Sequence, residues 1–108
     1  MEHCYPHVGI VILNWRRPND TIACLQSLET LDYPSYEVVV VDNDSTDGSV
    51  ALIRQRFPRT TVIENGRNLG FAAGNNVGIA HLMQRNADYV LLLNEDTEVA
   101  SDLLSVLV

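Results

Sequence analysis

Short, almost continuous apolar runs alternate along this chain with segments in which apolar residues recur every three or four positions, as they do on one face of a helix. Four such runs predict strands, over residues 8–13, 38–41, 60–63 and 89–93. Helix start and stop signals predict helices that begin near Pro18, at Asp47 or Ser49, at Phe71 and after Ser101. Strands that are apolar at nearly every position are typical of a sheet covered on both faces, and crossover helices join parallel strands. The pattern therefore predicts an α/β fold: a Rossmann-like open parallel sheet in strand order 3-2-1-4 with helices on both faces.

The charged residues exclude several classes of function. The chain has 14 acidic and seven basic residues, a net charge of −7, and every basic residue is an arginine. Without lysine there is no P-loop and no Schiff-base chemistry. A net negative charge is the wrong sign for a protein that binds a nucleic-acid backbone. A phosphate ligand would instead need a cation between it and the protein.

The sequence gives no signal for export or membrane insertion. No apolar run approaches about 20 residues, the length that spans a bilayer. The first seven residues lack the basic and apolar regions of a signal peptide. Cys4 and Cys24 have no metal-binding spacing, which favours free thiols in a reducing compartment. We therefore expect a cytoplasmic chain without a transmembrane segment.

Polar residues follow three of the predicted strands, at the edge where open α/β sheets bind ligands. They are Asn14-Trp15-Arg16, Asp42-Asn43-Asp44 and Asn94-Glu95-Asp96. In the predicted strand order the two acidic ends lie on either side of the first strand, about 10 Å apart at about 4.8 Å per strand spacing. That separation suits an extended ligand with a base at one end and a metal-bound diphosphate at the other.

Each of these features also has a purely structural interpretation. Asp42 either accepts a hydrogen bond from a ligand, such as a pyrimidine N–H, or begins an Asx turn. Trp15 either stacks on a base or fills the core. The acidic residues after the fourth strand either hold Mg²⁺ against a diphosphate or form a solvated turn. Three glycines spaced by four residues favour close packing of a helix on the sheet, at Gly70, Gly74 and Gly78.

Four segments of the chain together resemble the sequence motifs of a known protein family. They are VGIVILNWRRP at residues 8–18, VVDNDSTDGS at 40–49, NLGFAAGNNVGI at 68–79 and LLNEDT at 92–97. In this order they resemble the family-2 glycosyltransferases of GT-A fold, and the third segment looks most like the rhamnosyltransferase-like members. The resemblance covers residues 8 to about 104. It implies that residues 1–108 are the N-terminal nucleotide-sugar-binding portion of a GT-A domain, truncated so that the acceptor half is absent.

The resemblance implies roles for individual residues at the base end of the site. Leu13, Asn14 and Trp15 would flank the nucleotide base, and Asp42 would accept a hydrogen bond from the base or ribose. Asn76 stands where the family has a recurring asparagine before its Gly-Ile pair, and a ligand contact is the implied role. The donor would be a nucleotide-diphospho-sugar of UDP, dTDP or GDP type.

At the diphosphate end, the resemblance implies a variant DxD-type motif. Asp96 would be its metal-binding last member, with Asn94 in the first position and Glu95 beside them, and the cofactor would be Mg²⁺ or Mn²⁺. In the family the carboxylate that deprotonates the acceptor hydroxyl lies after this strand. We therefore expect no catalytic residue within residues 1–108, and no sugar transfer by these residues alone.

The resemblance further implies inverting transfer to a saccharide or lipid-linked acceptor, in cell wall or polysaccharide biosynthesis, with many members working at the cytosolic face of the membrane. One alternative is a non-catalytic nucleotide-sensing or interaction module, in which the sheet is a scaffold and the acids are turn residues. A phosphoacceptor signalling domain also has acids at strand ends, but it would need a lysine near the last strand, and this chain has none.

Overall fold

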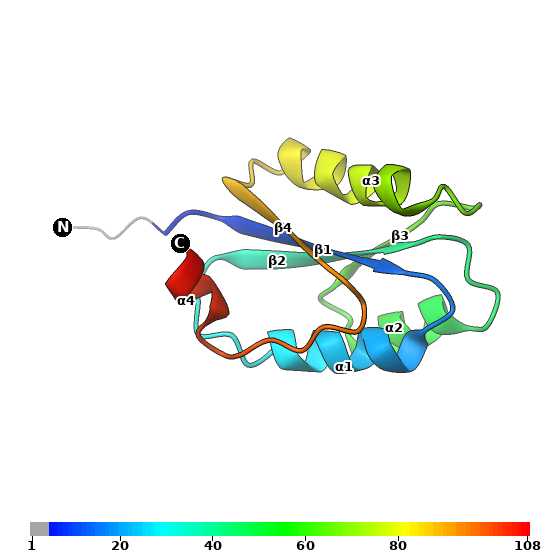
Figure 1. Cartoon of the computed structure of the whole chain (residues 1–108), viewed down its shortest axis with the longest axis horizontal. Coiled ribbons are helices and arrows are strands. Elements are labelled where there is room, and N and C mark those ends of the chain that lie inside the picture. The colour runs from blue at the N-terminus through cyan, green and yellow to red at the C-terminus, as the bar shows by residue number, and fades with distance from the viewer. Residues whose placement is uncertain (1–4) are drawn as a thin grey trace.

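The computed structural model describes residues 5–108, in which strands and helices alternate (Figure 1). The elements are β1 (Val8–Asn14), α1 (Pro18–Leu28), β2 (Tyr36–Asp42), α2 (Ser49–Arg56), β3 (Thr61–Glu64), α3 (Phe71–Gln84), β4 (Tyr89–Leu93) and α4 (Leu103–Leu107). Every predicted strand and helix is present. Within the described residues, no helix is both long and apolar enough to cross a bilayer.

The strands form a parallel sheet in the order β3-β2-β1-β4, as predicted. In the register, Asn14 of β1 lies opposite Asp42 of β2, and Ile12 of β1 lies opposite Leu93 of β4. The last residues of β2 and β4 therefore flank the end of β1 at one edge of the sheet. This arrangement confirms that the acidic segments after β2 and β4 lie at the same edge, on either side of β1.

Helices cover both faces of the sheet: α3 packs on one face, and α1 and α2 pack on the other (Figure 1). Because side chains alternate along a strand, β1 supplies both cores. Ile10 and Ile12 pack in the cluster that contains Leu25, whereas Val11 packs with Leu82 of α3. These residues are at most 2% exposed, and burying a side chain of this kind contributes about 1.5–3 kcal/mol.

Two of the three regularly spaced glycines let α3 approach the sheet closely. A Cβ on Gly78 would lie 2.6 Å from Val11 Cγ1, and one on Gly74 would lie 2.8 Å from Leu13 Cδ1. The packing role predicted for these glycines is confirmed at both positions. Gly70 differs, because it precedes the helix with a positive φ of 82°, a conformation that glycine adopts without strain.

The helix starts were predicted with mixed success. Pro18 is the first residue of α1, as expected. The prediction that Asp47 or Ser49 caps the second helix is wrong, because Gly48 is the N-cap of α2 and Ser49 is its first residue. Asp47 nevertheless supports this helix start, since its side chain accepts a hydrogen bond from the Ser49 N–H at 3.1 Å. The prediction that Ser101 caps the last helix is wrong, because α4 begins at Leu103 with Asp102 at its N-cap.

An ionic cluster lies at the opposite, amino-terminal edge of the sheet. Glu37 accepts hydrogen bonds from His7 Nε2 at 2.6 Å and from Arg85 Nε at 2.5 Å. Burial by itself raises the pKa of Glu37, but the hydrogen bonds and charges of these two partners outweigh it, so the pKa lies below its ordinary value. The cluster ties the end of α3 to the strands β1 and β2.

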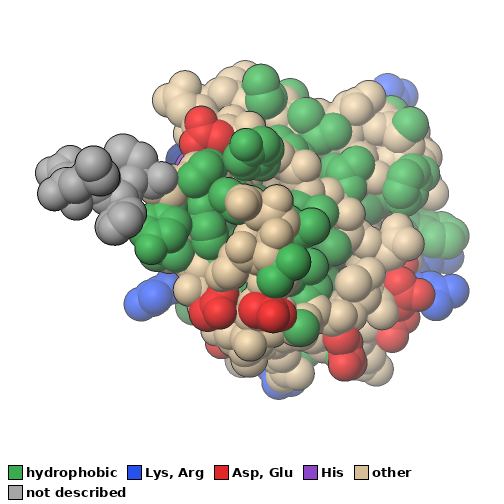
Figure 2. All heavy atoms as spheres, turned by 60° about the vertical axis from the view of Figure 1, so that its left-hand side comes forward, with side chains coloured by type: hydrophobic (Ala, Val, Ile, Leu, Met, Phe, Trp, Pro, Cys, Tyr) green, Lys and Arg blue, Asp and Glu red, His purple; other side chains and the backbone are tan. Residues whose placement is uncertain are grey.

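Hydrophobic side chains gather on the face of the molecule next to its N-terminal end, with acidic side chains along the lower border of that face (Figure 2). The large exposed hydrophobic residues of the molecule include Tyr89 and Leu92 of the edge strand β4. They also include Val106, Leu107 and Val108 at the C-terminal end. An apolar edge strand with free backbone groups is a surface on which another strand can pair.

Candidate functional site

A cavity of about 350 Å³ opens at the carboxyl edge of the sheet, between the ends of β1 and β4. Its lining residues are Leu13, Trp15, Arg17, Phe71, Leu93, Asn94, Glu95 and Asp96. Five of these belong to the eight site residues predicted from the sequence: Leu13, Trp15, Asn94, Glu95 and Asp96. The cavity brings them together because β1 and β4 are neighbours in the sheet, although the two segments are about 80 positions apart in sequence.

Trp15 offers an aromatic surface at this cavity. It directly follows the last residue of β1 and is 44% exposed, which excludes the interpretation that it fills the core. The guanidinium of Arg16 lies 5.0 Å from the centre of its ring. Phe71, the first residue of α3, is also exposed and lines the cavity. Two accessible aromatic rings suit a ligand with a flat, π-bonded base.

Glu95 is held by the turn that follows β1. Its Oε2 accepts a hydrogen bond from the Trp15 N–H at 3.2 Å, and its Oε1 lies 3.8 Å from Arg17 Nε. Burial raises the pKa of the Glu95 carboxyl above its ordinary value, against the opposing effects of the Trp15 N–H and the Arg17 charge. Both oxygens of the Glu95 side chain therefore face partners within the protein.

Asn94 and Asp96 are both exposed at the cavity. Within residues 5–108 no group of three or more His, Cys, Asp or Glu side chains is arranged to hold a metal ion. Mg²⁺ commonly uses only one or two protein carboxylates and takes its other ligands from substrate phosphates and water. The donor set at Asp96 therefore fits a cation that is shared with a diphosphate, rather than a metal site complete in the protein alone.

Asn14 and Asp42 lie at the same edge but are buried inside the protein. Asn14 is 0% exposed and Asp42 is 2% exposed. The Asn14 Nδ2 donates to Asp42 Oδ1 at 2.8 Å, and the Thr21 hydroxyl donates to Asn14 Oδ1 at 2.6 Å. The Ser45 N–H donates to Asp42 Oδ2 at 2.9 Å, a bond that spans three residues, so Asp42 supports the loop after β2 without forming the two-residue Asx turn of the alternative interpretation. Neither side chain lines the cavity, and the base contact for Asp42 and Asn14 stays a prediction.

Asn76 is also placed outside the cavity. It is exposed on α3, whereas its neighbour Asn75 is the buried amide and donates from Nδ2 to the Phe71 carbonyl at 3.1 Å. The sequence showed that this helix contains an unusual pair of asparagines. In the structure the buried one, Asn75, stabilises the first turn of α3. Asn76 does not line the cavity, and its ligand contact stays a prediction.

Sequence reasoning missed Arg17 and Phe71 in the cavity, and Asn43 behind it. Asn43 is buried; its Oδ1 accepts from Asn65 Nδ2 at 2.8 Å and its Nδ2 donates to the Gly70 carbonyl at 3.1 Å. These bonds fix the loop before α3 and thereby the position of Phe71. Both residues lie in segments that carry the family resemblance, and Phe71 was the predicted start of a helix, but nothing in the sequence indicated that either side chain lines a cavity.

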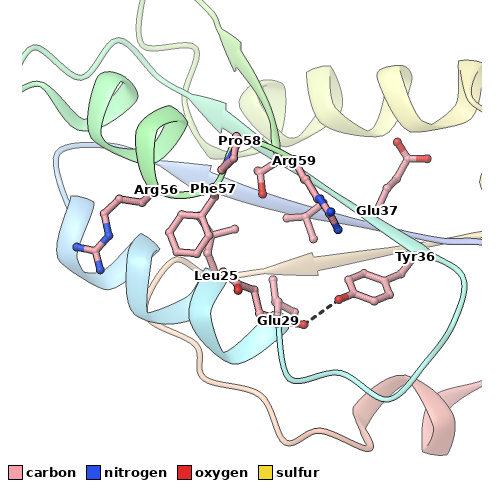
Figure 3. A pocket seen from close by; sticks show the side chains of 11 residues that line it. Leu25, Glu29, Tyr36, Glu37, Arg56, Phe57, Pro58 and Arg59 are labelled. Carbon is pink, nitrogen blue, oxygen red and sulfur yellow. Dashed lines mark hydrogen bonds between the residues drawn. The ribbon is translucent and has the colours of Figure 1, made fainter.

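A larger cavity, of about 630 Å³, lies away from this edge, beside the ends of α1 and α2 (Figure 3). Its lining residues are Leu25, Leu28, Glu29, Tyr36, Glu37, Val38, Arg56, Phe57, Pro58, Arg59 and Thr60. None of them is a predicted site residue. Two arginines, Arg56 and Arg59, balance its two carboxylates, Glu29 and Glu37, so charge does not exclude an anion here. The cavity lies at the amino ends of β2 and β3, however, whereas open α/β sheets bind ligands at the carboxyl ends of their strands.

The chain is similar in sequence to a glycolipid synthase and to a galactofuranosyltransferase. It is 32% identical over 107 residues to the beta-monoglucosyldiacylglycerol synthase of Synechocystis sp., a match that covers 93% of this chain and 22% of that protein. It is 32% identical over 91 residues to the galactofuranosyltransferase GlfT1 of Mycobacterium tuberculosis, covering 82% of this chain and 30% of the relative. The chain thus spans between about a fifth and just under a third of the length of these curated relatives.

A solved structure shares the fold. The mannosyltransferase PcManGT of Pyrobaculum calidifontis, solved in complex with GDP-Man and Mn²⁺, superposes with a TM-score of 0.83 and 27% sequence identity, covering 93% of this chain and 30% of that one. The likeness confirms the predicted open parallel sheet with its helices, the arrangement of a GT-A domain. The sequence profile of Glycosyl transferase family 2 matches residues 9–108. Because that match spans nearly the whole chain, this protein belongs to glycosyl transferase family 2.

Proposed function

We propose that residues 1–108 form the donor-binding half of an inverting glycosyltransferase, and that the carboxyl-edge cavity holds a nucleotide-diphospho-sugar together with Mg²⁺ or Mn²⁺. The observation that carries this proposal is the convergence of Trp15, Asn94 and Asp96 in one cavity from the ends of two neighbouring strands. The complex of a structurally similar mannosyltransferase with GDP-Man and Mn²⁺ supports the class of ligand.

The cavity provides separate surfaces for the parts of such a donor. The exposed rings of Trp15 and Phe71 offer stacking surfaces for the base, and the Arg17 guanidinium offers a charge for the diphosphate. The oxygens of Asp96 and Asn94 are the hard ligands that a divalent cation prefers. When bound there, a cation would neutralise charge on the departing diphosphate.

Asp42 and Asn14 contribute indirectly in this proposal. Their mutual hydrogen bond joins the ends of β2 and β1, and the Ser45 hydroxyl, held in the same turn, accepts a hydrogen bond from the Arg16 N–H at 2.8 Å. The two buried side chains thereby support the backbone that carries Trp15. Asn76 has no counterpart role in the cavity, and the proposal assigns it none.

The finer parts of the proposal rest on the family resemblance. They are a rhamnosyltransferase-like subgroup, an acceptor hydroxyl on a saccharide or lipid-linked molecule, inversion at the anomeric carbon, and work at the cytosolic face of a membrane. Transfer requires a general base within hydrogen-bond reach of the acceptor hydroxyl. No side chain in the cavity is proposed for that step, so residues 1–108 alone should bind donor without transferring sugar.

Isothermal titration calorimetry with UDP, dTDP and GDP, each with and without Mn²⁺, tests the proposal. We expect binding of at least one nucleotide to strengthen with Mn²⁺, and Asp96→Asn to remove that strengthening. Glu98→Gln is the matched control, because it removes one negative charge from an exposed residue nearby that does not line the cavity. A metal-dependent heat that is undiminished in Asp96→Asn would refute the role of Asp96.

A further inference from the structure

The Glu95 side chain connects the turn after β1 to the turn after β4. Its two oxygens are used separately: Oε2 accepts the Trp15 N–H at 3.2 Å, and Oε1 lies 3.8 Å from Arg17 Nε. The side chain is 20% exposed, whereas Asn94 and Asp96 on either side of it are exposed. The Thr97 N–H donates to the Asn94 carbonyl at 3.0 Å, which closes a turn around residues 95 and 96.

The backbone that Glu95 holds is unusual. Arg16 has a φ of 57°, in the left-handed region that residues other than glycine seldom adopt and that persists only where neighbouring groups enforce it. Two successive amides of this turn are bonded to side chains from other strand ends. The Trp15 N–H donates to Glu95 after β4, and the Arg16 N–H donates to Ser45 after β2. The turn after β1 is therefore clamped from both sides.

Arg17 is also held by carboxylates, but its guanidinium remains accessible to a ligand in the cavity. Its guanidinium lies between Glu95 at 3.8 Å and Asp20 at 3.6 Å, and its side chain is still 66% exposed. In a chain with a net charge of −7, an accessible cation beside Asp96 reduces the repulsion that an incoming anion would meet. The orientation of the Arg17 side chain toward the cavity depends on the Glu95 carboxylate that faces it.

We propose that Glu95 is a positioning residue rather than a metal ligand: its carboxylate fixes Trp15 and Arg17 in the cavity wall, while its neighbour Asp96 is left to meet the cation. The inference rests on the proposed donor-binding function, and it separates two adjacent acids that the sequence motif treats as one group. Trp15 is the single tryptophan of the chain, so its fluorescence reports on this turn alone.

Acrylamide quenching of Trp15 fluorescence, measured without nucleotide or metal, tests the inference directly. Glu95→Ala should raise the quenching constant by up to about twofold, because Trp15 is already 44% exposed and a released turn would expose its ring fully. Glu95→Gln should restore most of the protection, since an amide oxygen still accepts the Trp15 N–H. Glu98→Ala, which removes an exposed acid nearby, should leave quenching unchanged. Far-UV circular dichroism would establish that each variant is folded.

Equal quenching in Glu95→Ala and the unsubstituted chain would overturn the inference. So would a loss of Mn²⁺-dependent nucleotide binding in Glu95→Gln as complete as that in Asp96→Asn, because Glu95 would then behave as a ligand of the cation. The quenching experiment uses neither nucleotide nor metal. A chain that binds no nucleotide would therefore refute the proposed function, while the quenching result would still decide whether Glu95 holds the turn.

Discussion

Replacing Asp42 with asparagine should destabilise the fold, because Asp42 stabilises the carboxyl edge of the sheet from within. The carboxylate accepts two hydrogen bonds, from Asn14 Nδ2 at 2.8 Å and from the Ser45 N–H at 2.9 Å. An asparagine has one acceptor oxygen, so its NH₂ group would face one of these two donors. Asn14 and residue 42 are almost completely buried, so water cannot satisfy the Asn14 amide if it loses its partner, and the Ser45 N–H is itself partly buried.

A buried donor without a partner costs about 1–3 kcal/mol, and hydrogen bonds to a charged group lie in the upper part of that range. We expect Asp42→Asn to lower the free energy of unfolding by about 2 kcal/mol. For a domain near 100 residues this corresponds to a fall in Tm of about 5–15 °C. Thermal and urea unfolding followed by circular dichroism would measure both quantities.

Asp44→Asn is the matched control for this variant. Asp44 is exposed and has a φ of 66°, a conformation that asparagine and aspartate both tolerate, so the control removes the same charge at little cost. If Asp42→Asn were no less stable than Asp44→Asn, the interpretation of Asp42 as a buried support would be wrong. A second readout follows from nucleotide titrations. An indirect role weakens UDP, dTDP and GDP equally, whereas a direct base contact would alter the preference among them.

Three other properties of the chain are predicted from the same structure. Gly78→Ala should cost about 1–3 kcal/mol of unfolding free energy, because its Cβ would lie 2.6 Å from a methyl group of Val11; an unchanged urea midpoint would argue against the close packing of α3. Because the partners of Glu37 lower its pKa, the stability that Glu37 contributes is present above the pKa of an unfolded glutamate and is lost as pH falls through the lower folded value. Glu37→Gln should therefore reduce the loss of unfolding free energy between neutral and acid pH. An identical acid loss in the variant and the unsubstituted chain would contradict this. Cys24 is fully buried, and burial, assisted by the charges of Asp96 and Glu98, raises its pKa to about 11; in a Cys4→Ser background it should react with a thiol reagent at pH 8 only after unfolding, and rapid labelling of the folded chain would refute this.

The fold could be predicted from the sequence because its signals are local. Continuous apolar runs identified the strands, and the parallel order followed from the helices between them. Residues that end β1 and β4 were placed correctly in one cavity, since Trp15 and Asp96 directly follow their strands or lie within a few residues of them. The position of a residue along the chain was enough to bring it to the right edge of the sheet.

The direction of each side chain could not be predicted in the same way. The ligand contacts of Asp42 and Asn14 stay predictions, but the sequence did not show that the register of β1 against β2 places the two residues opposite each other, where their side chains form a buried pair. That pairing depends on the alignment of two strands, which no single segment encodes. Asn43 and Phe71 were missed for a related reason, because their roles arise from contacts between β2 and the loop before α3.

Paramagnetic broadening of amide resonances by Mn²⁺, measured with ¹⁵N-labelled protein and a nucleoside diphosphate, tests the central proposal most directly. The donor-site assignment predicts that broadening begins at residues 94–96 and reaches Trp15, Arg17 and Phe71 before other parts of the chain. Broadening centred on Glu29, Glu37 and residues 56–59, or spread evenly over the acidic surface, would contradict it.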